Sequence, residues 1–194
     1  KKKIRESRTK GTKLLSDALA NLAQPPKTLI SASAIGYYGH RADELLTEKS
    51  APGNDFLAAV CIEWENATRA AIEKGIRTVN TRFGIILDAN EGALAKMLTP
   101  FRMGIGGRIG DGKQWMSWIA IEDVVRAIAF LLESRSVAGA FNATAPNPVR
   151  NADFSRALGE ALGAQLPVPP SSGARRFPEG HWRHYAAALS GPFA

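Results

Sequence analysis

Apolar positions along the chain follow two patterns, and each pattern predicts a different kind of element. Apolar residues at helical spacing predict helices, over residues 3–23, 54–74, 92–103, 121–134 and 151–163. Short apolar runs predict strands, over residues 27–33, inside 76–87, over 114–119 and over 141–144. Because strands and helices alternate, the pattern predicts an α/β fold with a mostly parallel sheet.

The two ends of the chain depart from this pattern. The chain opens on a helix, with neither a strand nor a glycine-rich turn ahead of it. From about Ser171 onward the apolar periodicity stops, which predicts an irregular or disordered tail over residues 171–194. Residues 1–170 therefore hold all of the predicted elements.

The composition of the 194 residues is that of an ordinary globular domain, with 45% hydrophobic and 22% charged residues. No apolar run approaches the roughly 20 residues that cross a membrane, and the basic N-terminus has no apolar segment behind it. We therefore expect a cytoplasmic protein without a membrane partner. The single cysteine excludes an intrachain disulfide and a cysteine-based zinc cluster, and we expect no metal site.

The formal net charge of +7 raises the question of a nucleic-acid partner. The excess of lysine and arginine lies in residues 1–13 and 171–194, and the segment between them is nearly neutral. A nucleic-acid binder usually carries a basic face with aromatic residues or a known motif. The distribution instead favours a solvated helix start and a basic tail, with no nucleic-acid partner.

The segment from Ser31 to Gly39 is the most informative feature of the chain. It follows a short apolar run and begins with small residues and hydroxyls, Ser31-Ala32-Ser33. Ligands of open α/β sheets bind outside the carboxyl ends of the strands, where small residues let them approach the backbone closely. We therefore expect a ligand site at this strand end.

This segment, the run over residues 55–65 and the tryptophan-rich run over 114–119 together resemble one protein family. They are similar to the atypical, extended short-chain dehydrogenase/reductases called epimerase-family or sugar-nucleotide-epimerase-related proteins, whose plant members are linked to chloroplast division. The resemblance covers about residues 3–168. Further motifs fall in the family's order and spacing, namely Gly92-Ala93-Leu94, Gly106-Gly107 and Thr144-Ala145-Pro146-Asn147-Pro148.

The resemblance implies a partial Rossmann-like, doubly wound parallel sheet with a small substrate-binding lobe. Residues 1–170 would be the C-terminal part of an NAD(P)-binding epimerase domain. The family's glycine-rich dinucleotide turn belongs to its first βαβ units, which we expect to be missing from this chain. NAD and NADP both stay open as the cofactor, because the residues that distinguish them follow that turn.

The resemblance also assigns the positions of the usual proton relay. In ordinary members a Tyr exchanges the proton, a Lys four residues later holds the nicotinamide ribose, and an upstream Ser binds the substrate oxygen. Ser33 matches that Ser, whereas Leu57 falls at the Tyr position and Cys61 at the Lys position. Cys61 could face the cofactor as a catalytic residue or pack in the core as a small hydrophobe.

Other candidates follow from the same resemblance and from residue chemistry. Tyr37, with its neighbour Tyr38, could replace the missing acid or pack in its turn. Arg82, at a strand end, could bind a phosphate bidentately or form a surface ion pair. The expected cofactor contacts are Ser31, Ala32, Arg8, Arg82 and Gly84, and the expected substrate contacts are Arg102, Gln114 and Trp115.

Three functions remain open at this point. The first is an NAD(P)-dependent oxidoreductase or epimerase that acts on a small molecule, such as a nucleotide sugar or a carbonyl compound. The second is a non-catalytic dinucleotide-binding regulator of the cell- or plastid-division type, which the loss of the relay favours. The third is an inactive fragment. The sequence predicts no oligomeric state.

Overall fold

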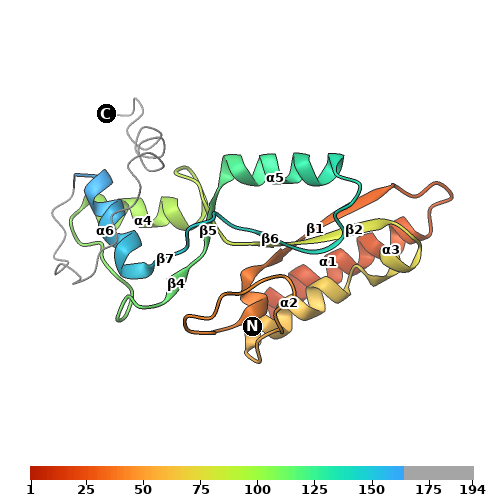
Figure 1. Ribbon diagram of the computed structural model, residues 1–194, viewed down its shortest axis with the longest axis horizontal. Coiled ribbons are helices and arrows are strands. Elements are labelled where there is room, and N and C mark those ends of the chain that lie inside the picture. The colour runs from red at the N-terminus through yellow and green to blue at the C-terminus, as the bar shows by residue number, and fades with distance from the viewer. Residues whose placement is uncertain (164–194) are drawn as a thin grey trace. The chain divides into compact units, whose positions relative to one another are not determined.

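The computed structural model describes residues 1–163 and divides the chain into two compact units (Figure 1). The first unit comprises residues 1–84 and 121–145, and the second comprises 85–120 and the chain from Pro146 onward. The tail predicted over 171–194, and the boundary predicted at residue 170, lie outside the described residues.

A three-stranded parallel sheet forms the centre of the first unit. Its strands are β1 (Thr28–Ala34), β2 (Arg77–Phe83) and β6 (Gly139–Ala143), in the spatial order β1-β2-β6. The parallel sheet that the alternating pattern predicted is therefore confirmed. Val79, at the centre of β2, is fully buried, as expected for the middle strand of a sheet covered on both faces.

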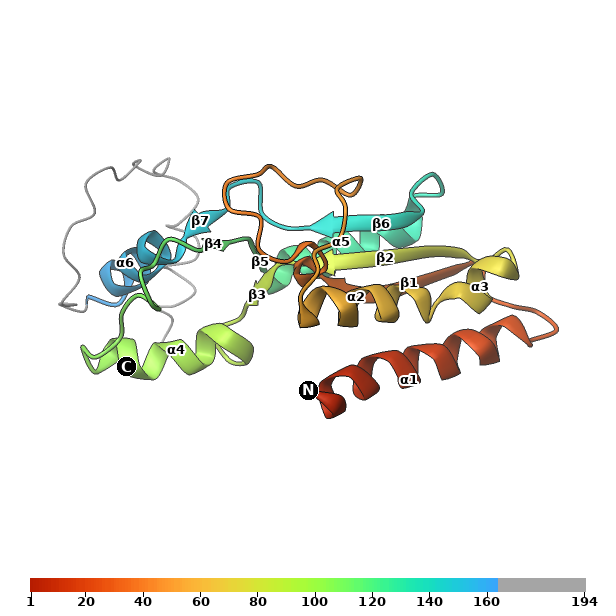
Figure 2. The ribbon, with the colours of Figure 1, turned by 90° about the horizontal axis from the view of Figure 1, so that it is seen from below.

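Helices cover both faces of this sheet, so the doubly wound arrangement is also confirmed. Figures 1 and 2 show α5 (Ile121–Glu133) on one face, and α2 (Phe56–Asn66) and α3 (Arg69–Glu73) on the other. The first helix, α1 (Lys2–Ala20), packs against α2 and α3.

The helix predicted over residues 54–74 is two helices, which corrects the sequence prediction. Asp55 caps the start of α2, where its carboxylate accepts a hydrogen bond from the Ala58 amide at 2.8 Å. Helix α2 ends near Thr68, whose hydroxyl donates a hydrogen bond to the Glu65 carbonyl at 2.7 Å. In α3, the Ala71 amide donates to the Ser16 hydroxyl of α1 at 3.0 Å. Side chains thus satisfy backbone groups at the break.

The strand predicted within residues 76–87 is also interrupted. It divides at Gly84 into β2 and β3 (Ile85–Leu87), and β3 belongs to the second unit. The Gly84 amide donates to the Ala143 carbonyl at 3.0 Å, which is the last hydrogen bond from this segment to the first sheet.

The part of the second unit that the structure describes, up to residue 163, holds two short strand pairs and two helices. β3 pairs in parallel with β5 (Trp118–Ala120), and β4 (Trp115–Met116) pairs antiparallel with β7 (Val149–Arg150). The strand predicted over 114–119 is therefore two strands with different partners, and β7 was not predicted. Its helices, α4 (Gly92–Arg102) and α6 (Asn151–Ala161), contribute apolar residues to its core: Leu94, Leu98, Phe101, Phe154 and Leu158.

Within residues 1–163, no helix has the length and apolar character needed to cross a membrane. The same part of the chain contains no group of three or more metal-ligating side chains placed to hold an ion.

Candidate functional site

Polar side chains stand side by side at the carboxyl ends of the three parallel strands. Ser33 of β1 is paired in register with Arg82 of β2, and Arg82 is paired with Asn142 of β6. Neighbouring residues in register project to the same face of a sheet. The strand end predicted to carry a site therefore carries a row of three polar residues, of which the sequence prediction named Ser33 and Arg82.

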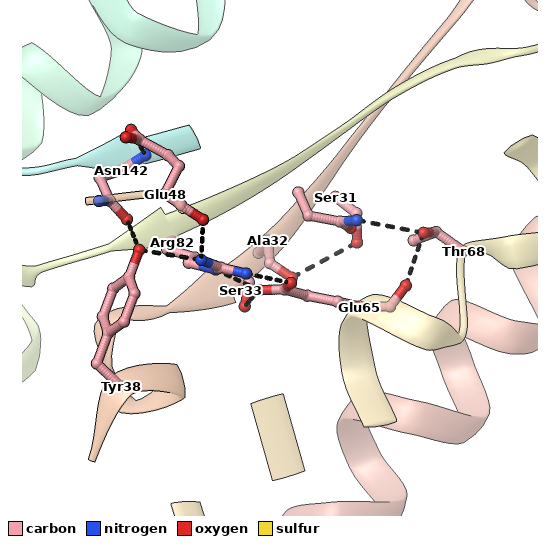
Figure 3. A network of polar contacts seen from close by, with 10 residues as sticks. Ser31, Ala32, Ser33, Tyr38, Glu48, Glu65, Thr68, Arg82 and Asn142 are labelled. Carbon is pink, nitrogen blue, oxygen red and sulfur yellow. Dashed lines mark hydrogen bonds and ion pairs between the residues drawn. The ribbon is translucent and has the colours of Figure 1, made fainter. Parts of the chain in front are cut away.

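Arg82 forms a buried, two-pronged ion pair with Glu65 of α2 (Figure 3). Its Nε donates to Glu65 Oε1 at 2.7 Å and its Nη2 donates to Oε2 at 2.8 Å. The side chains are only 4% and 13% exposed, so solvent screens this pair far less than a surface pair. One alternative predicted that Arg82 forms an ion pair at the surface. Arg82 does form an ion pair, but the pair is buried, so the predicted surface location is wrong.

Ser33 joins this pair through its hydroxyl. Ser33 Oγ lies 2.7 Å from Glu65 Oε1, and the residue is 3% exposed. A carboxylate held by an arginine offers only acceptor positions, so the hydroxyl hydrogen of Ser33 points at Glu65. Hydrogen bonds to a charged acceptor are shorter and stronger than those between neutral groups.

Tyr38 connects Arg82 to the third strand. It lies in a short 3₁₀ helix, η1 (Ile35–Tyr38), which the sequence reading missed. Its hydroxyl accepts a hydrogen bond from Arg82 Nη1 at 2.9 Å and donates one to Asn142 Oδ1 at 2.6 Å. Because its hydroxyl makes both hydrogen bonds and only 3% of the residue is exposed, Tyr38 has a structural role and links Arg82 to Asn142.

Tyr37, the candidate acid, lies against the same guanidinium. The Arg82 Cζ atom is 3.4 Å from the centroid of the Tyr37 ring, which is a close cation–π contact. The two tyrosine rings meet edge to face, with their centroids 5.3 Å apart. Tyr37 therefore belongs to the Arg82 cluster, and its catalytic role stays a prediction.

The loop over residues 40–53 returns to the strand ends, where hydrogen bonds hold it at its base and at Glu48, whose carbonyl accepts one from Arg82 Nη1 at 3.5 Å. At its base the Gly53 amide donates to the Tyr37 carbonyl at 2.9 Å. A side chain at Gly53 would place its Cβ 2.7 Å from the Tyr38 carbonyl oxygen, so only glycine permits this approach. Further along, Glu48 Oε1 accepts a hydrogen bond from the Asn142 amide at 2.9 Å.

The electrostatics of the cluster keep Arg82 charged. Burial alone would lower the pKa of Arg82, but its hydrogen bonds to Glu65 and Tyr38 outweigh burial and raise that pKa. The opposite holds for the thiol of Cys61, whose pKa is raised above its ordinary value of 9.0, chiefly by burial. Cys61 is 5% exposed, with its sulfur close to the Gly36 turn.

Among the described contacts, the remaining predicted cofactor residues do not join the side-chain hydrogen bonds of the row. Ser31 is buried two residues before Ser33, and Ala32 between them is exposed. Arg8 stacks on Trp64 at 5.5 Å on the surface of α1. The three predicted substrate residues, Arg102, Gln114 and Trp115, lie in the second unit, where Gln114 bonds the Ile109 carbonyl at 3.0 Å.

The sequence reading missed three residues of the network, namely Glu48, Glu65 and Asn142. Glu65 lies four residues after Cys61, so helical spacing already placed it on the face of α2 that meets the strand ends. Asn142 is the second residue of the strand predicted over 141–144, and in the observed strand β6 it lies next to the carboxyl end. The missing information was the register, which puts Asn142 beside Arg82.

A family model described as "NAD dependent epimerase/dehydratase family" matches residues 2–143 of the chain. The chain belongs to this family. The resemblance inferred from the sequence motifs is thereby confirmed, together with the NAD(P)-dependent character of the family.

Several relatives and solved structures are similar to the chain. An epimerase family protein of Mycobacterium bovis is 42% identical over 168 residues, covering 87% of this chain and 55% of that protein. A chloroplastic SDR39U1 homologue of Arabidopsis thaliana is 41% identical over 173 residues, covering 87% and 50%. The chain thus spans about half the length of these relatives.

Among solved structures, the human epimerase family protein SDR39U1 with NADPH is 34% identical with a TM-score of 0.80, over 87% of this chain and 59% of that one. A structure described as a nucleoside-diphosphate sugar epimerase, from Corynebacterium glutamicum, is 40% identical with a TM-score of 0.76, over 97% and 42%.

Proposed function

We propose that this chain contributes to an NAD(P)-dependent oxidoreductase or epimerase that acts on a small molecule without the usual Tyr-Lys proton relay. The observation that carries the proposal is the likeness to the human protein solved with NADPH, at 34% identity and a TM-score of 0.80. The polar row at the strand ends supports it, because ligands of open α/β sheets bind at that edge.

The residues at the end of β1 fit the approach of a nicotinamide cofactor. Ala32 is exposed between two buried serines, so no large side chain blocks this stretch of backbone. When bound, the cofactor would supply hydride transfer. Ser31 and Ala32 would line its position, and Arg8 and Gly84 would contribute from the neighbouring helix and strand end.

The two relay positions of α2 offer no ordinary proton carrier. Leu57 has no ionisable group, and the buried thiol of Cys61 stays protonated at neutral pH because burial raises its pKa. The groups left to bind the reacting oxygen or to move a proton are Ser33 and Tyr37. The Arg82–Glu65 pair would hold both of them in place.

For the substrate we propose a nucleotide sugar or a carbonyl compound. The structure named as a nucleoside-diphosphate sugar epimerase supports the first class at 40% identity. Arg102, Gln114 and Trp115 of the second unit would contact this substrate. We further propose a cytoplasmic location.

The first experiment is a fluorescence titration of the 194-residue chain with NADPH and with NADH. We expect saturable binding of at least one of them. Turnover is then measured against a panel of nucleotide sugars and carbonyl compounds, with the wild type and with Ser33→Ala. Absence of dinucleotide binding would refute the proposal for this chain and would favour an inactive fragment.

A second candidate is a non-catalytic dinucleotide-binding regulator. The observation that favours it is that Leu57 and Cys61 occupy the two relay positions of α2, so that neither position carries the usual Tyr or Lys. Binding of NADPH together with no turnover across the panel would select this candidate, whereas turnover that depends on Ser33 would select the enzyme.

A further inference from the structure

The hydroxyl hydrogen of Ser33 is already in use. Ser33 Oγ donates to Glu65 Oε1 at 2.7 Å, and Glu65 is in turn held by Arg82 at both oxygens, at 2.7 and 2.8 Å (Figure 3). A serine hydroxyl has one hydrogen to donate and two lone pairs that accept. Toward any third group, Ser33 therefore presents lone pairs only.

The acceptor cannot easily turn away and release this hydrogen. Arg82 is fixed by Tyr38, whose hydroxyl bonds both Arg82 Nη1 at 2.9 Å and Asn142 Oδ1 at 2.6 Å. Rotation of the Ser33 hydroxyl toward a ligand would remove one hydrogen bond from a carboxylate that is only 13% exposed. Such a buried charged acceptor is costly to leave with fewer partners.

We infer that Ser33 selects a hydrogen-bond donor, an O–H or N–H group, on the bound ligand, and that Glu65 is the positioning residue that enforces this choice. The inference rests on the proposed function and changes one of its details. The family resemblance assigns Ser33 to bind the substrate oxygen, which leaves open whether Ser33 donates or accepts the hydrogen bond. With its hydrogen held by Glu65, Ser33 accepts a hydrogen bond, so the alcohol form of a substrate is favoured over the carbonyl form.

Two sources could supply this donor. One is a hydroxyl of the substrate, and the other is the carboxamide of a nicotinamide cofactor. Ser33 is the second-to-last residue of β1 and is 3% exposed, so only a small part of it is open to either source.

The first measurement looks for the hydrogen itself. We expect a slowly exchanging hydroxyl proton in the NMR spectrum of the 194-residue chain, absent in Ser33→Ala and shifted in Glu65→Gln. A matched control, Ser155→Ala, should leave it in place, because Ser155 is equally buried but its hydroxyl has no partner within the described residues. Absence of this proton in the wild type would contradict the donated hydrogen bond.

The second measurement tests the choice of ligand, with cyclohexanol and cyclohexanone as probes that share a ring and differ in the reacting group. We expect cyclohexanol to bind about tenfold more tightly than cyclohexanone in an NMR titration, and the ratio to approach one in Ser33→Ala and in Glu65→Gln. The Ser155→Ala control should keep the wild-type ratio. A purely structural role of Glu65 would leave this ratio unchanged.

NADPH titrated into the same variants separates the two sources. A tenfold weaker affinity for NADPH in Ser33→Ala, without a change in the cyclohexanol preference, would assign the donor to the carboxamide. Tighter binding of the ketone, or no effect of Ser33→Ala on either probe or on NADPH, would overturn the inference. Failure of wild-type NADPH binding alone would refute the proposed function, and the ratio of the two cyclohexyl probes would still test Ser33 separately.

Discussion

Removal of the Arg82 charge should destabilise the protein far more than removal of an exposed arginine. Arg82→Met keeps most of the side-chain volume but leaves the carboxyl group of Glu65, which is 13% exposed, without its cation. Breaking a buried ion pair from one side costs about 3–5 kcal/mol in the free energy of unfolding. The Tyr38 hydroxyl also loses a donor, although its bond to Asn142 remains.

An exposed pair of the same type provides the control. Arg69 and Glu73 lie 2.6 Å apart in α3, with side chains 80% and 61% exposed. Solvent and side-chain entropy offset most of the attraction in such a pair, so Arg69→Met should cost less than about 0.5 kcal/mol. The predicted contrast between the two arginines is therefore at least about sixfold in free energy.

The assay is urea unfolding of the wild type, the two arginine variants, the single variant Glu65→Leu and the double variant Arg82→Met/Glu65→Leu. Because the double variant leaves no unpaired charge, it should recover most of the stability lost in Arg82→Met. Equal losses in Arg82→Met and Arg69→Met would refute the buried, coupled pair. Strict addition of the Arg82→Met and Glu65→Leu losses in the double variant would do the same.

Three further predictions concern single side chains. The raised pKa of the Cys61 thiol predicts that iodoacetamide alkylates Cys61 about tenfold more slowly at pH 8 in the folded than in the unfolded chain. It also predicts that the free energy of unfolding falls as the pH rises above 9.0, because the thiol of the unfolded state ionises first. Urea unfolding should not find this part of the pH dependence in Cys61→Ala. Arg77→Met removes a 2.9 Å hydrogen bond to the Leu131 carbonyl at the end of α5 and should cost about 2 kcal/mol in urea unfolding. Ser16→Ala leaves the buried Ala71 amide unpaired and should lower the free energy of unfolding by about 1–2 kcal/mol, whereas retained stability would show that water replaces the hydroxyl.

The elements that the sequence predicts well are those with a long, regular pattern. The helix expected over 121–134 is α5, Ile121–Glu133, and the strand expected over 27–33 is β1, Thr28–Ala34. The failures share one physical cause, which is a contact distant in sequence. Just after the break at Thr68, the Ala71 amide donates to the hydroxyl of Ser16, 55 residues away, and β7 exists only because Trp115 and Met116 pair with it.

The same limit applies to the candidate site, of which the local sequence predicts some residues but not their partners. Strand ends with small or polar residues follow from local sequence, and they indicated Ser33 and Arg82. The partners of these residues do not follow from it, since Glu65 and Asn142 reach Arg82 through helix docking and strand register. A residue's chemistry can be read from its type, but its protonation and its donor or acceptor role depend on the neighbours that the fold supplies.

The geometry separates the residues that hold this site from those that would perform its chemistry. The bonds that fix it, from Arg82 to Glu65 and Tyr38 and from Tyr38 to Asn142, use no atom of the two relay positions. A change of the relay residues therefore leaves the scaffold intact. Under the proposed function, Leu57 and Cys61 at the relay positions would remove one route for a proton and would leave the proposed ligand position in place. That is why oxidoreductase and non-catalytic binding protein are both compatible with the same strand ends, and why turnover, rather than cofactor binding, decides between them.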